Sequence, residues 1–346
     1  MPSLPGSSLP GFVDAHTHLL AVAAGERIRD DNASYYRSLA SRGTTPTDVI
    51  HGFDAGVNLP VAFGRALEQA AAVGLVEIHE AGMQHWEYWE ALQRLRDTEI
   101  LPVRVRIFVA SGVADLRRMD HTSDPWLAVS GVKFYADGSL CTRTCAVDSA
   151  FADTADKGLL FLDAHTLAQR AEPFANDGWT IATHAIGDRA INAVLDAYEM
   201  IYGGDCAVHA PRIEHAQLLT SSIVDRMAGL GVTACVQPCF GSSDWDHVIA
   251  AVPTLIDTAY RYQVLVDHGV NVIAGSDYPI EPLSPLENLQ RLVTGHNTQA
   301  PVMTMSDAIS IMTSVAAGVT HLDGSLDDID PELISTVRVL GTEPAC

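Results

Sequence analysis

The segment FVDAHTHL, residues 12–19, begins with apolar residues and ends with polar ones. An apolar entry of this kind is typical of a buried strand. Side chains two residues apart on a strand point to the same face, so we expect Asp14, His16 and His18 to project together. Two imidazoles on one rigid strand end supply half of a metal site. The segment therefore predicts a strand with a metal site at its end.

The composition excludes several classes of function. The chain has 346 residues, 47% of them hydrophobic, which suits one large α/β domain or two smaller ones. Its formal net charge of −22 repels phosphate backbones and acidic membrane surfaces, so we expect neither nucleic acid nor a membrane as a partner. We expect a small-molecule substrate, and leave a homo-oligomer open.

The cysteines and the N-terminal sequence indicate the compartment. The six cysteines form no C-x-x-C pair, and in a chain of this size they are typical of reduced thiols. No basic region precedes an apolar one at the N-terminus, and no apolar run approaches the roughly 18 residues that span a bilayer. These features favour a cytoplasmic protein.

Short β-rich runs alternate with helical patterns along the chain. The runs predict strands at residues 12–16, 75–79, 103–110, 129–137, 179–184, 212–217, 232–237 and 271–274. Helical periodicity predicts helices at residues 61–73, 86–95, 113–119, 167–174, 189–201, 222–230, 258–266 and 286–293. Eight strand–helix units predict an α/β fold, the closed (β/α)8 TIM barrel.

The remaining segments set the domain limits. We assign residues 1–322 to the barrel domain and residues 323–346 to a C-terminal tail. The tail has acidic turns and then a run at residues 334–340, which predicts one lone strand outside the barrel. The irregular segment 21–60 follows the histidine pair, so we expect it to form a loop over the active-site mouth.

Five of the predicted strand ends carry residues of the kind that bind metals. In barrel enzymes the chemistry lies at the carboxyl ends of the strands, so side chains from distant parts of the chain meet there. The candidates are His16, His18, Lys133, His184, His215 and Asp277. Their order along the chain fits a single barrel mouth.

Lys133 lies between Val132 and Phe134, so strand alternation turns it into the barrel. Burial disfavours the ammonium form of a lysine. A neutral amine beside two divalent cations can add carbon dioxide, and the resulting carbamate can bridge both metals. The alternative is an ion pair between Lys133 and a barrel carboxylate such as Asp137.

Asp277 follows the eighth predicted strand in the sequence GSDYP. It can ligate a metal, and it can also take a proton from metal-bound water and return that proton to the leaving group. The alternative is a carboxylate that caps a helix, but Tyr278 and Pro279 continue the loop. Asp277 is therefore the candidate general base and acid.

These motifs together resemble the amidohydrolase superfamily of metal-dependent hydrolases, and more narrowly its amidohydrolase-3 (YtcJ-like) branch. The resemblance rests on the histidine pair and on the runs VKFYADGSL at 132–140, THAIGDRA at 183–190, RIEHAQ at 212–217 and GSDYP at 275–279. It implies hydrolysis of a C–N bond in an amide, formamide or cyclic amide through metal-bound hydroxide, or a deamination.

The resemblance also implies a ligand set. One metal would be held by His16, His18 and Asp277, the other by His184 and His215, with carboxylated Lys133 between them. The expected cofactors are two divalent metal ions, with zinc as the expected metal.

The chain departs from the pattern of this branch in two ways. Its members carry a β-sandwich built from both chain ends, which is reduced or missing here. The segment between the first two predicted strands, residues 18–74, is also shorter than in the branch.

Three further residues are candidates with open alternatives. Arg143 could hold a substrate carboxylate or be a solvated loop arginine. Gln237 could contact substrate or orient a neighbour. His79 could support the metal ligands from outside or be a hydrogen-bonded core histidine.

Three other functions compete with the C–N hydrolase. A mononuclear deaminase of an amino heterocycle would use one metal and an unmodified Lys133. A lactone or phosphoester hydrolase would use the same nucleophile on another centre. A catalytically degenerate metal-binding barrel would bind metal without turnover.

Overall fold

Ten strands form one sheet in the computed structural model, which describes residues 7–26, 32–98, 100–121, 124–295, 302–326 and 329–345. The strand order is β10-β9-β1-β2-β3-β4-β5-β6-β7-β8, and β1 to β8 pair in parallel with their neighbours in this order. The strands are β1 (Ser7–Thr17), β2 (Leu75–Met83), β3 (Arg104–Ala110), β4 (Leu127–Tyr135), β5 (Thr180–Ala185), β6 (Arg212–His215), β7 (Thr233–Val236), β8 (Asn271–Ala274), β9 (Thr313–Leu322) and β10 (Val339–Pro344).

Each of the eight predicted strands overlaps one of β1 to β8, so the parallel part of the sheet is confirmed. The sixth ends two residues earlier than predicted, at His215. His215 and Ala216 have φ angles of 76° and 46°, and an extended strand cannot continue through a left-handed backbone.

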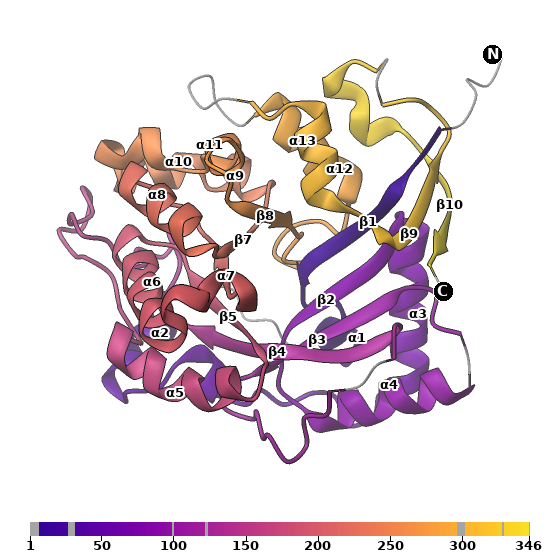
Figure 1. The fold of residues 1–346 in the computed structure, drawn as a ribbon, viewed down its shortest axis with the longest axis horizontal. Helices are drawn as coiled ribbons and strands as arrows, with labels where there is room; N and C mark the ends of the chain where they lie inside the picture. Colours follow the sequence, from indigo (N-terminus) through magenta and orange to yellow (C-terminus); the bar gives the residue numbers. More distant parts are fainter. Residues whose placement is uncertain are drawn as a thin grey trace.

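The helices surround the parallel strands in chain order (Figure 1). They are α1 (Leu19–Ala23), α2 (Ala33–Ser41), α3 (Leu59–Ala72), α4 (Trp86–Thr98), α5 (Ala164–Asn176), α6 (Asp188–Tyr202), α7 (Cys206–His209), α8 (Ser221–Leu230), α9 (Phe240–Ser243), α10 (Trp245–Ala251), α11 (Tyr262–Asp267), α12 (Pro285–Thr294) and α13 (Met305–Met312). The apolar core combines buried strand and helix side chains, including Ile78, Val132 and Leu195. None of the helices in the described ranges is both long and apolar enough to cross a membrane.

Two predicted helices need correction. The helix expected at residues 113–119 is wrong: turns replace it, because the Asp115 carboxylate accepts a hydrogen bond from the Arg117 amide and favours a local turn. The helix expected from residue 258 begins only at Tyr262. Tyr260, just before it, has a φ of 54°, which is incompatible with an α-helix.

The prediction of a lone strand at residues 334–340 is also wrong, both in where the strand lies and in that it was expected to be unpaired. Pro331–Thr336 form a 3-10 helix, η4, which starts where Asp330 accepts a hydrogen bond from the Glu332 amide. The strand β10 follows at Val339 and pairs antiparallel with β9, which was not predicted. Because β9 pairs with the first half of β1, the sheet extends beyond its parallel part.

The segment after β8 returns to β1. The Asp277 amide donates to the His16 carbonyl at 2.7 Å, and the His18 amide donates to the Tyr278 carbonyl at 2.9 Å. Asp14 accepts hydrogen bonds from the amide and hydroxyl of Ser276 at 2.9 and 2.5 Å. These contacts hold the ends of β1 and β8 together in a mixed α/β fold with a large parallel sheet.

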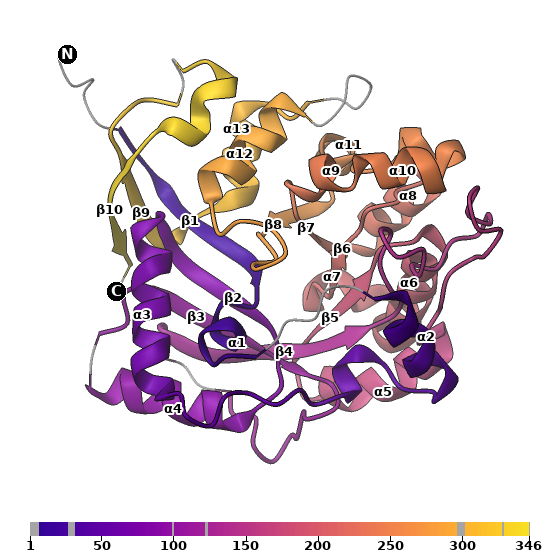
Figure 2. The ribbon, with the colours of Figure 1, turned by 180° about the vertical axis from the view of Figure 1, so that it is seen from behind.

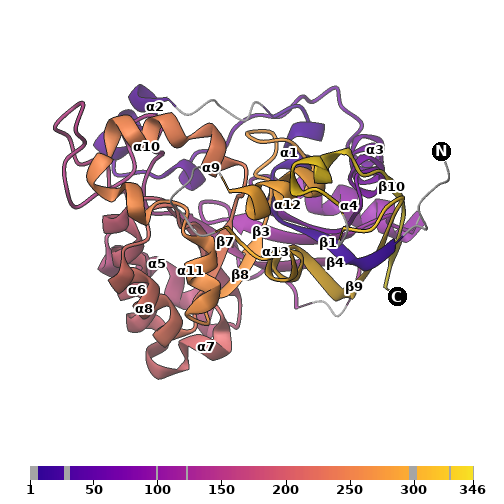
Figure 3. The same cartoon turned by 90° about the horizontal axis from the view of Figure 1, so that it is seen from above.

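The segment 21–60, expected as a loop, contains the short helices α2 and η1 (Pro46–Asp48). Figure 2 shows the whole molecule from behind, and in Figure 3 α2 and α10 lie on the same side of the molecule. Tyr35 and Thr47 from this segment line the cavity described below, so its expected position over the mouth is confirmed.

Candidate metal centre

One cavity lies at the carboxyl ends of the parallel strands. It is lined by all six residues predicted to bind metals: His16, His18, Lys133, His184, His215 and Asp277. These side chains come from β1, β4, β5, β6 and the segment that follows β8. The structure therefore brings together the whole predicted ligand set.

The first half of the set consists of His16, His18 and Asp277. The Oδ1 atom of Asp277 lies 3.5 Å from Nε2 of His16 and 3.3 Å from Nε2 of His18. His215 joins them, since ligand atoms of His16, His215 and Asp277 all lie within 4.8 Å of one another. Nitrogen and carboxylate donors at this spacing can hold one divalent cation.

The second half of the set consists of His184 and His215, whose ring centroids are 4.4 Å apart. The Nε2 atom of His184 lies 3.0 Å from the carbonyl oxygen of Gly138, and the ring stacks on Tyr135. Its other nitrogen, Nδ1, is buried and has no hydrogen-bond partner among the described residues. Buried polar atoms are nearly always satisfied, so this orphaned nitrogen fits a metal ligand.

Two of the proposed ligands have a strained backbone. His215 and Asp277 have φ angles of 76° and 57°, which non-glycine residues rarely adopt. On a regular strand His215 would point away from the face that its neighbour Glu214 occupies. Because the backbone is left-handed at His215, both Glu214 and His215 lie against His16. Oε2 of Glu214 is 2.5 Å from Nδ1 of His16, and the ring centroids of His16 and His215 are 5.0 Å apart.

Burial sets the protonation states of the site. It lowers the pKa of His16 to about 4, and it lowers the pKa of His215 well below its usual range. Burial alone would oppose ionisation of Asp277, but the neighbouring His16 and His18 outweigh it and hold the Asp277 pKa well below its ordinary value. Burial alone would lower the pKa of His18, but the hydrogen bond to Asp277 and its charge outweigh burial and raise it. The neutral imidazoles of His16 and His215 and the ionised carboxylate of Asp277 are the forms that bind a cation.

Lys133 is 3% exposed, and burial lowers the pKa of its amine. The alternative pairing with Asp137 is not seen in the described part of the chain. Asp137 instead accepts hydrogen bonds from the amides of Ala146, Ile186 and Gly187 at 2.9–3.0 Å. Lys133 lines the cavity, and no ion pair within 4 Å joins it to a carboxylate among the described residues, although the charges of Glu214 and Asp277 act on its amine.

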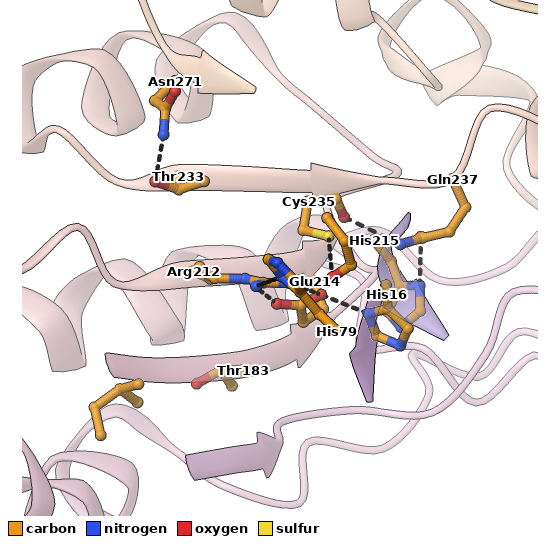
Figure 4. Close-up of polar contacts among 12 residues, drawn as sticks. His16, His79, Thr183, Arg212, Glu214, His215, Thr233, Cys235, Gln237 and Asn271 are labelled. Carbon is orange, nitrogen blue, oxygen red and sulfur yellow. Dashed lines mark hydrogen bonds and ion pairs between the residues drawn. The ribbon is translucent and has the colours of Figure 1, made fainter. Parts of the chain in front are cut away.

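The three residues with open alternatives lie outside the cavity wall. Arg143 binds Asp153 at 2.8 Å and the carbonyl of Leu140, so the structure does not bring it to the cavity. The Oε1 atom of Gln237 lies 2.7 Å from Nδ1 of His215, which fits the orienting alternative (Figure 4).

His79 does not contact any of the six cavity residues through a described hydrogen bond. Its Nε2 lies 3.0 Å from Glu77 and its Nδ1 lies 3.0 Å from Nη1 of Arg212. Among the described residues, the polar contacts that link it to the site run through Arg212 and Glu214.

Sequence reasoning missed the residues that hold the ligands from behind. Glu214 contacts His16, Arg212 holds Glu214, and Glu80 accepts hydrogen bonds from the amides of Leu20 and Ala21 just after the histidine pair. The sequence held one indication of this pair, because Arg212 and Glu214 are two residues apart on β6 and so share a face of the strand. Their partner on β1 could not be read from that spacing.

Histidines and a carboxylate at the carboxyl ends of a parallel sheet surrounded by helices define a metal-dependent hydrolase fold. A family model for the amidohydrolase family matches residues 25–326, so the chain belongs to this family. The match begins after His16 and His18, whose position in the site therefore rests on the geometry above.

Two curated relatives share part of the chain. The putative amidohydrolase YtcJ of Bacillus subtilis is 28% identical over 261 residues, which is 70% of this chain and 48% of that protein. The N-substituted formamide deformylase of Arthrobacter pascens is 32% identical over 127 residues, 36% of this chain and 23% of that protein. The chain thus matches about half of the first relative's length and less of the second's.

A solved structure supports the fold. An uncharacterised metal-dependent hydrolase from Pyrococcus horikoshii superposes with a TM-score of 0.74 at 20% sequence identity. The superposition covers 95% of this chain and 87% of that one. At this identity the likeness shows the fold alone.

Proposed function

We propose that this protein hydrolyses a C–N bond in an amide, formamide or cyclic amide at a centre of two divalent metal ions. The observation that carries the proposal is the convergence of four imidazoles, Lys133 and Asp277 on one cavity. The hydrogen bonds between the segment after β8 and β1 support a closed barrel as its scaffold.

Nitrogen and oxygen donors in this combination favour zinc. When bound, such ions polarise a carbonyl oxygen and lower the pKa of a water molecule towards 7. His16, His18 and Asp277 would hold one ion, and His184 and His215 the other. The orphaned Nδ1 of His184 supports the second position.

Lys133 would lie between the two positions as a carbamate. The neutral amine would attack the carbon of carbon dioxide: an N–C bond forms as the π bond of one C=O group opens onto its oxygen, and the nitrogen releases one proton to solvent water. Burial favours the neutral amine that this addition requires, since it lowers the pKa of Lys133. The product would be an anion with two oxygens that could hold the cations.

Asp277 would move the proton during the reaction. Its carboxylate is ionised, so it can accept a proton from the attacking water and then deliver it to the departing nitrogen. The carboxylate lies in the cavity wall beside His16 and His18, on the side of the cavity where the first ion would be held.

The outer cavity suits a substrate with an apolar part. Tyr35, Tyr36, Leu140 and Phe240 line it, and these surfaces bury a ring or an alkyl group well. A neutral N-formyl or N-acyl amine fits this lining. The partial likeness to a deformylase of N-substituted formamides points to the same class of substrate.

The proposal is tested by Asp277→Asn in the zinc-loaded protein, assayed on N-formyl amines, N-acyl amines and cyclic imides. We expect turnover by the wild type and a loss of at least about 100-fold in the variant, because the proton carrier is removed. Zinc content is measured beside activity, so that loss of metal is separated from loss of proton transfer.

Asp153→Asn is the control, since Asp153 contacts Arg143 outside the cavity. The proposal fails if the wild type turns over no amide, imide or ester, or if Asp277→Asn matches it. Turnover of an amino heterocycle with a single bound zinc would favour the deaminase instead.

A further inference from the structure

His16 has a carboxylate behind it. Its Nδ1 atom lies 2.5 Å from Oε2 of Glu214, and each of these side chains is 1% exposed (Figure 4). Glu214 belongs to β6 and His16 to β1, so the contact joins two strands that are not neighbours in the sheet. With Nδ1 engaged in this way, Nε2 of His16 is the nitrogen that faces Asp277.

Glu214 is itself held in place. Arg212 donates from Nε to Oε1 at 2.8 Å and from Nη2 to Oε2 at 3.1 Å. The same Nη2 donates to the carbonyl oxygen of Ala15 at 2.7 Å, which ties Arg212 to the strand that carries His16. A two-point contact of this kind fixes both the position and the rotation of the carboxylate.

Two of the other three ligand histidines, His184 and His215, have weaker partners. Nδ1 of His215 faces the amide oxygen of Gln237. Nε2 of His184 lies 3.0 Å from the carbonyl oxygen of Gly138 and 3.3 Å from Oδ1 of Asp137, a carboxylate whose oxygens already accept hydrogen bonds from three backbone amides. A carboxylate in short contact, as Glu214 is with His16 at 2.5 Å, raises the basicity of an imidazole more than an uncharged oxygen or a more distant carboxylate shared with three amides does, and so makes it a stronger metal ligand. The two proposed metal positions therefore differ in their support.

The same residues do not form a metal site of their own. His16, Glu214 and Cys235 also bring ligand atoms within 4.8 Å of one another. The Arg212 guanidinium already occupies both oxygens of Glu214, and burial raises the pKa of the Cys235 thiol well above its usual range. A cation placed there would meet an arginine and a protonated thiol.

We propose that Glu214, held by Arg212, is a positioning residue that fixes the ring of His16 for metal binding and makes the metal position served by His16 the tighter of the two. The inference rests on the proposed two-metal centre. It gives Glu214 and Arg212, which lie behind the metal ligands, a role in setting metal affinity.

The test is zinc affinity of the full chain, measured by chelator competition that resolves the two binding steps. In Glu214→Gln we expect the tighter dissociation constant to rise by about 10- to 100-fold, because supporting residues of this kind have that effect. The weaker constant should change by less than about threefold. Unchanged constants, or equal weakening of both, would overturn the inference.

Glu77→Gln is the matched control. Glu77 lies on β2, and its carboxylate contacts His79, which in turn contacts Arg212. It therefore belongs to the same network of polar contacts as Glu214, but it does not contact His16. Both zinc constants should stay at the wild-type values in this variant. Weakening of the tighter zinc in Glu77→Gln equal to that in Glu214→Gln would overturn the positioning role.

Glu214→Gln leaves Arg212 with a neutral partner and can impair folding. Glu214→Asp retains the charge for Arg212 but withdraws the carboxylate from His16, so the tighter zinc should again weaken selectively. Wild-type affinity in Glu214→Asp would contradict the inference. A wild type that binds no zinc contradicts the proposed function itself, and the two failures are thereby distinguished.

Discussion

Asp137 is the residue that joins the loop after β4 to the end of β5. It is fully buried, it accepts hydrogen bonds from the amides of Ala146, Ile186 and Gly187, and its Oδ1 lies 3.3 Å from Nε2 of His184. A carboxylate that satisfies several backbone donors is expensive to replace, because each donor it leaves is buried and unpaired. Its contacts hold the backbone that carries His184.

We expect Asp137→Asn to lower the free energy of unfolding by about 2–3 kcal/mol, since one amide oxygen cannot serve the donors that two carboxylate oxygens serve. Denaturant unfolding of the metal-free protein measures the change. Asp153→Asn is the comparison, because its exposed contact with Arg143 contributes less than about 1 kcal/mol. Equal effects of the two substitutions would show that Asp137 has no special role.

At the scale of elements, the close approach of β8 to β1 brings Asp277, which follows β8, next to His16 on β1. Gly275 follows β8, and a Cβ atom at this residue would lie 2.3 Å from the His16 amide nitrogen and 2.8 Å from Oδ1 of Asp14. Only glycine allows so close an approach of the two backbones. The distance between His16 and Asp277 therefore depends on a residue that has no side chain and cannot itself bind a metal.

Gly275→Ala should separate these segments. We expect a loss of about 1–3 kcal/mol in unfolding free energy and weaker zinc binding, because the added methyl group overpacks a rigid contact. Gly229→Ala, in α8, is the matched control: a Cβ atom there meets nothing within 4 Å. The account is wrong on this point if Gly275→Ala binds zinc and unfolds as the control does.

A contact between α5 and η1 holds the segment 21–60, part of which lines the cavity. Arg170 of α5 donates two hydrogen bonds to Asp48 of η1, which also accepts one from the Thr45 amide. Partial burial alone would raise the pKa of Asp48, but these donors outweigh it and lower the pKa below its ordinary value of 3.8. The ionised carboxylate thus stabilises the fold at neutral pH.

We expect Asp48→Asn to lower the unfolding free energy by about 1 kcal/mol at pH 7. Because the folded-state pKa is depressed, wild-type Asp48 gives its stability above the ordinary pKa and loses it as the pH falls through the folded-state value. The difference between the two proteins should therefore shrink below about pH 4. Unfolding measured from pH 7 to pH 3 checks this, and a constant difference would exclude the ion pair as its cause.

At the scale of the whole molecule, the parallel sheet and the ligand set could be predicted because both depend on local pattern. The β-rich runs between turn residues identify β1 to β8, and strand ends identify the residues that meet at one edge. The lone strand at residues 334–340 failed because Asp330 and Pro331 start a helix, so local capping outweighed an apolar run.

The supporting residues could not be predicted, because their roles depend on distant contacts. Glu214 meets His16 across 198 positions of the chain, and the left-handed backbone at His215 breaks the alternation on which strand reasoning depends. The strand β9 likewise depends on pairing with the N-terminal half of β1. Such features follow from how distant elements meet in space rather than from any one stretch of sequence.

The most direct measurement is the zinc content of the purified chain after dialysis against zinc and bicarbonate, compared with that of Lys133→Ala. The account predicts two equivalents per chain in the wild type and at most one in the variant, because the bridging group is lost. A wild type that retains no zinc, or a Lys133→Ala variant that retains two equivalents, would contradict it.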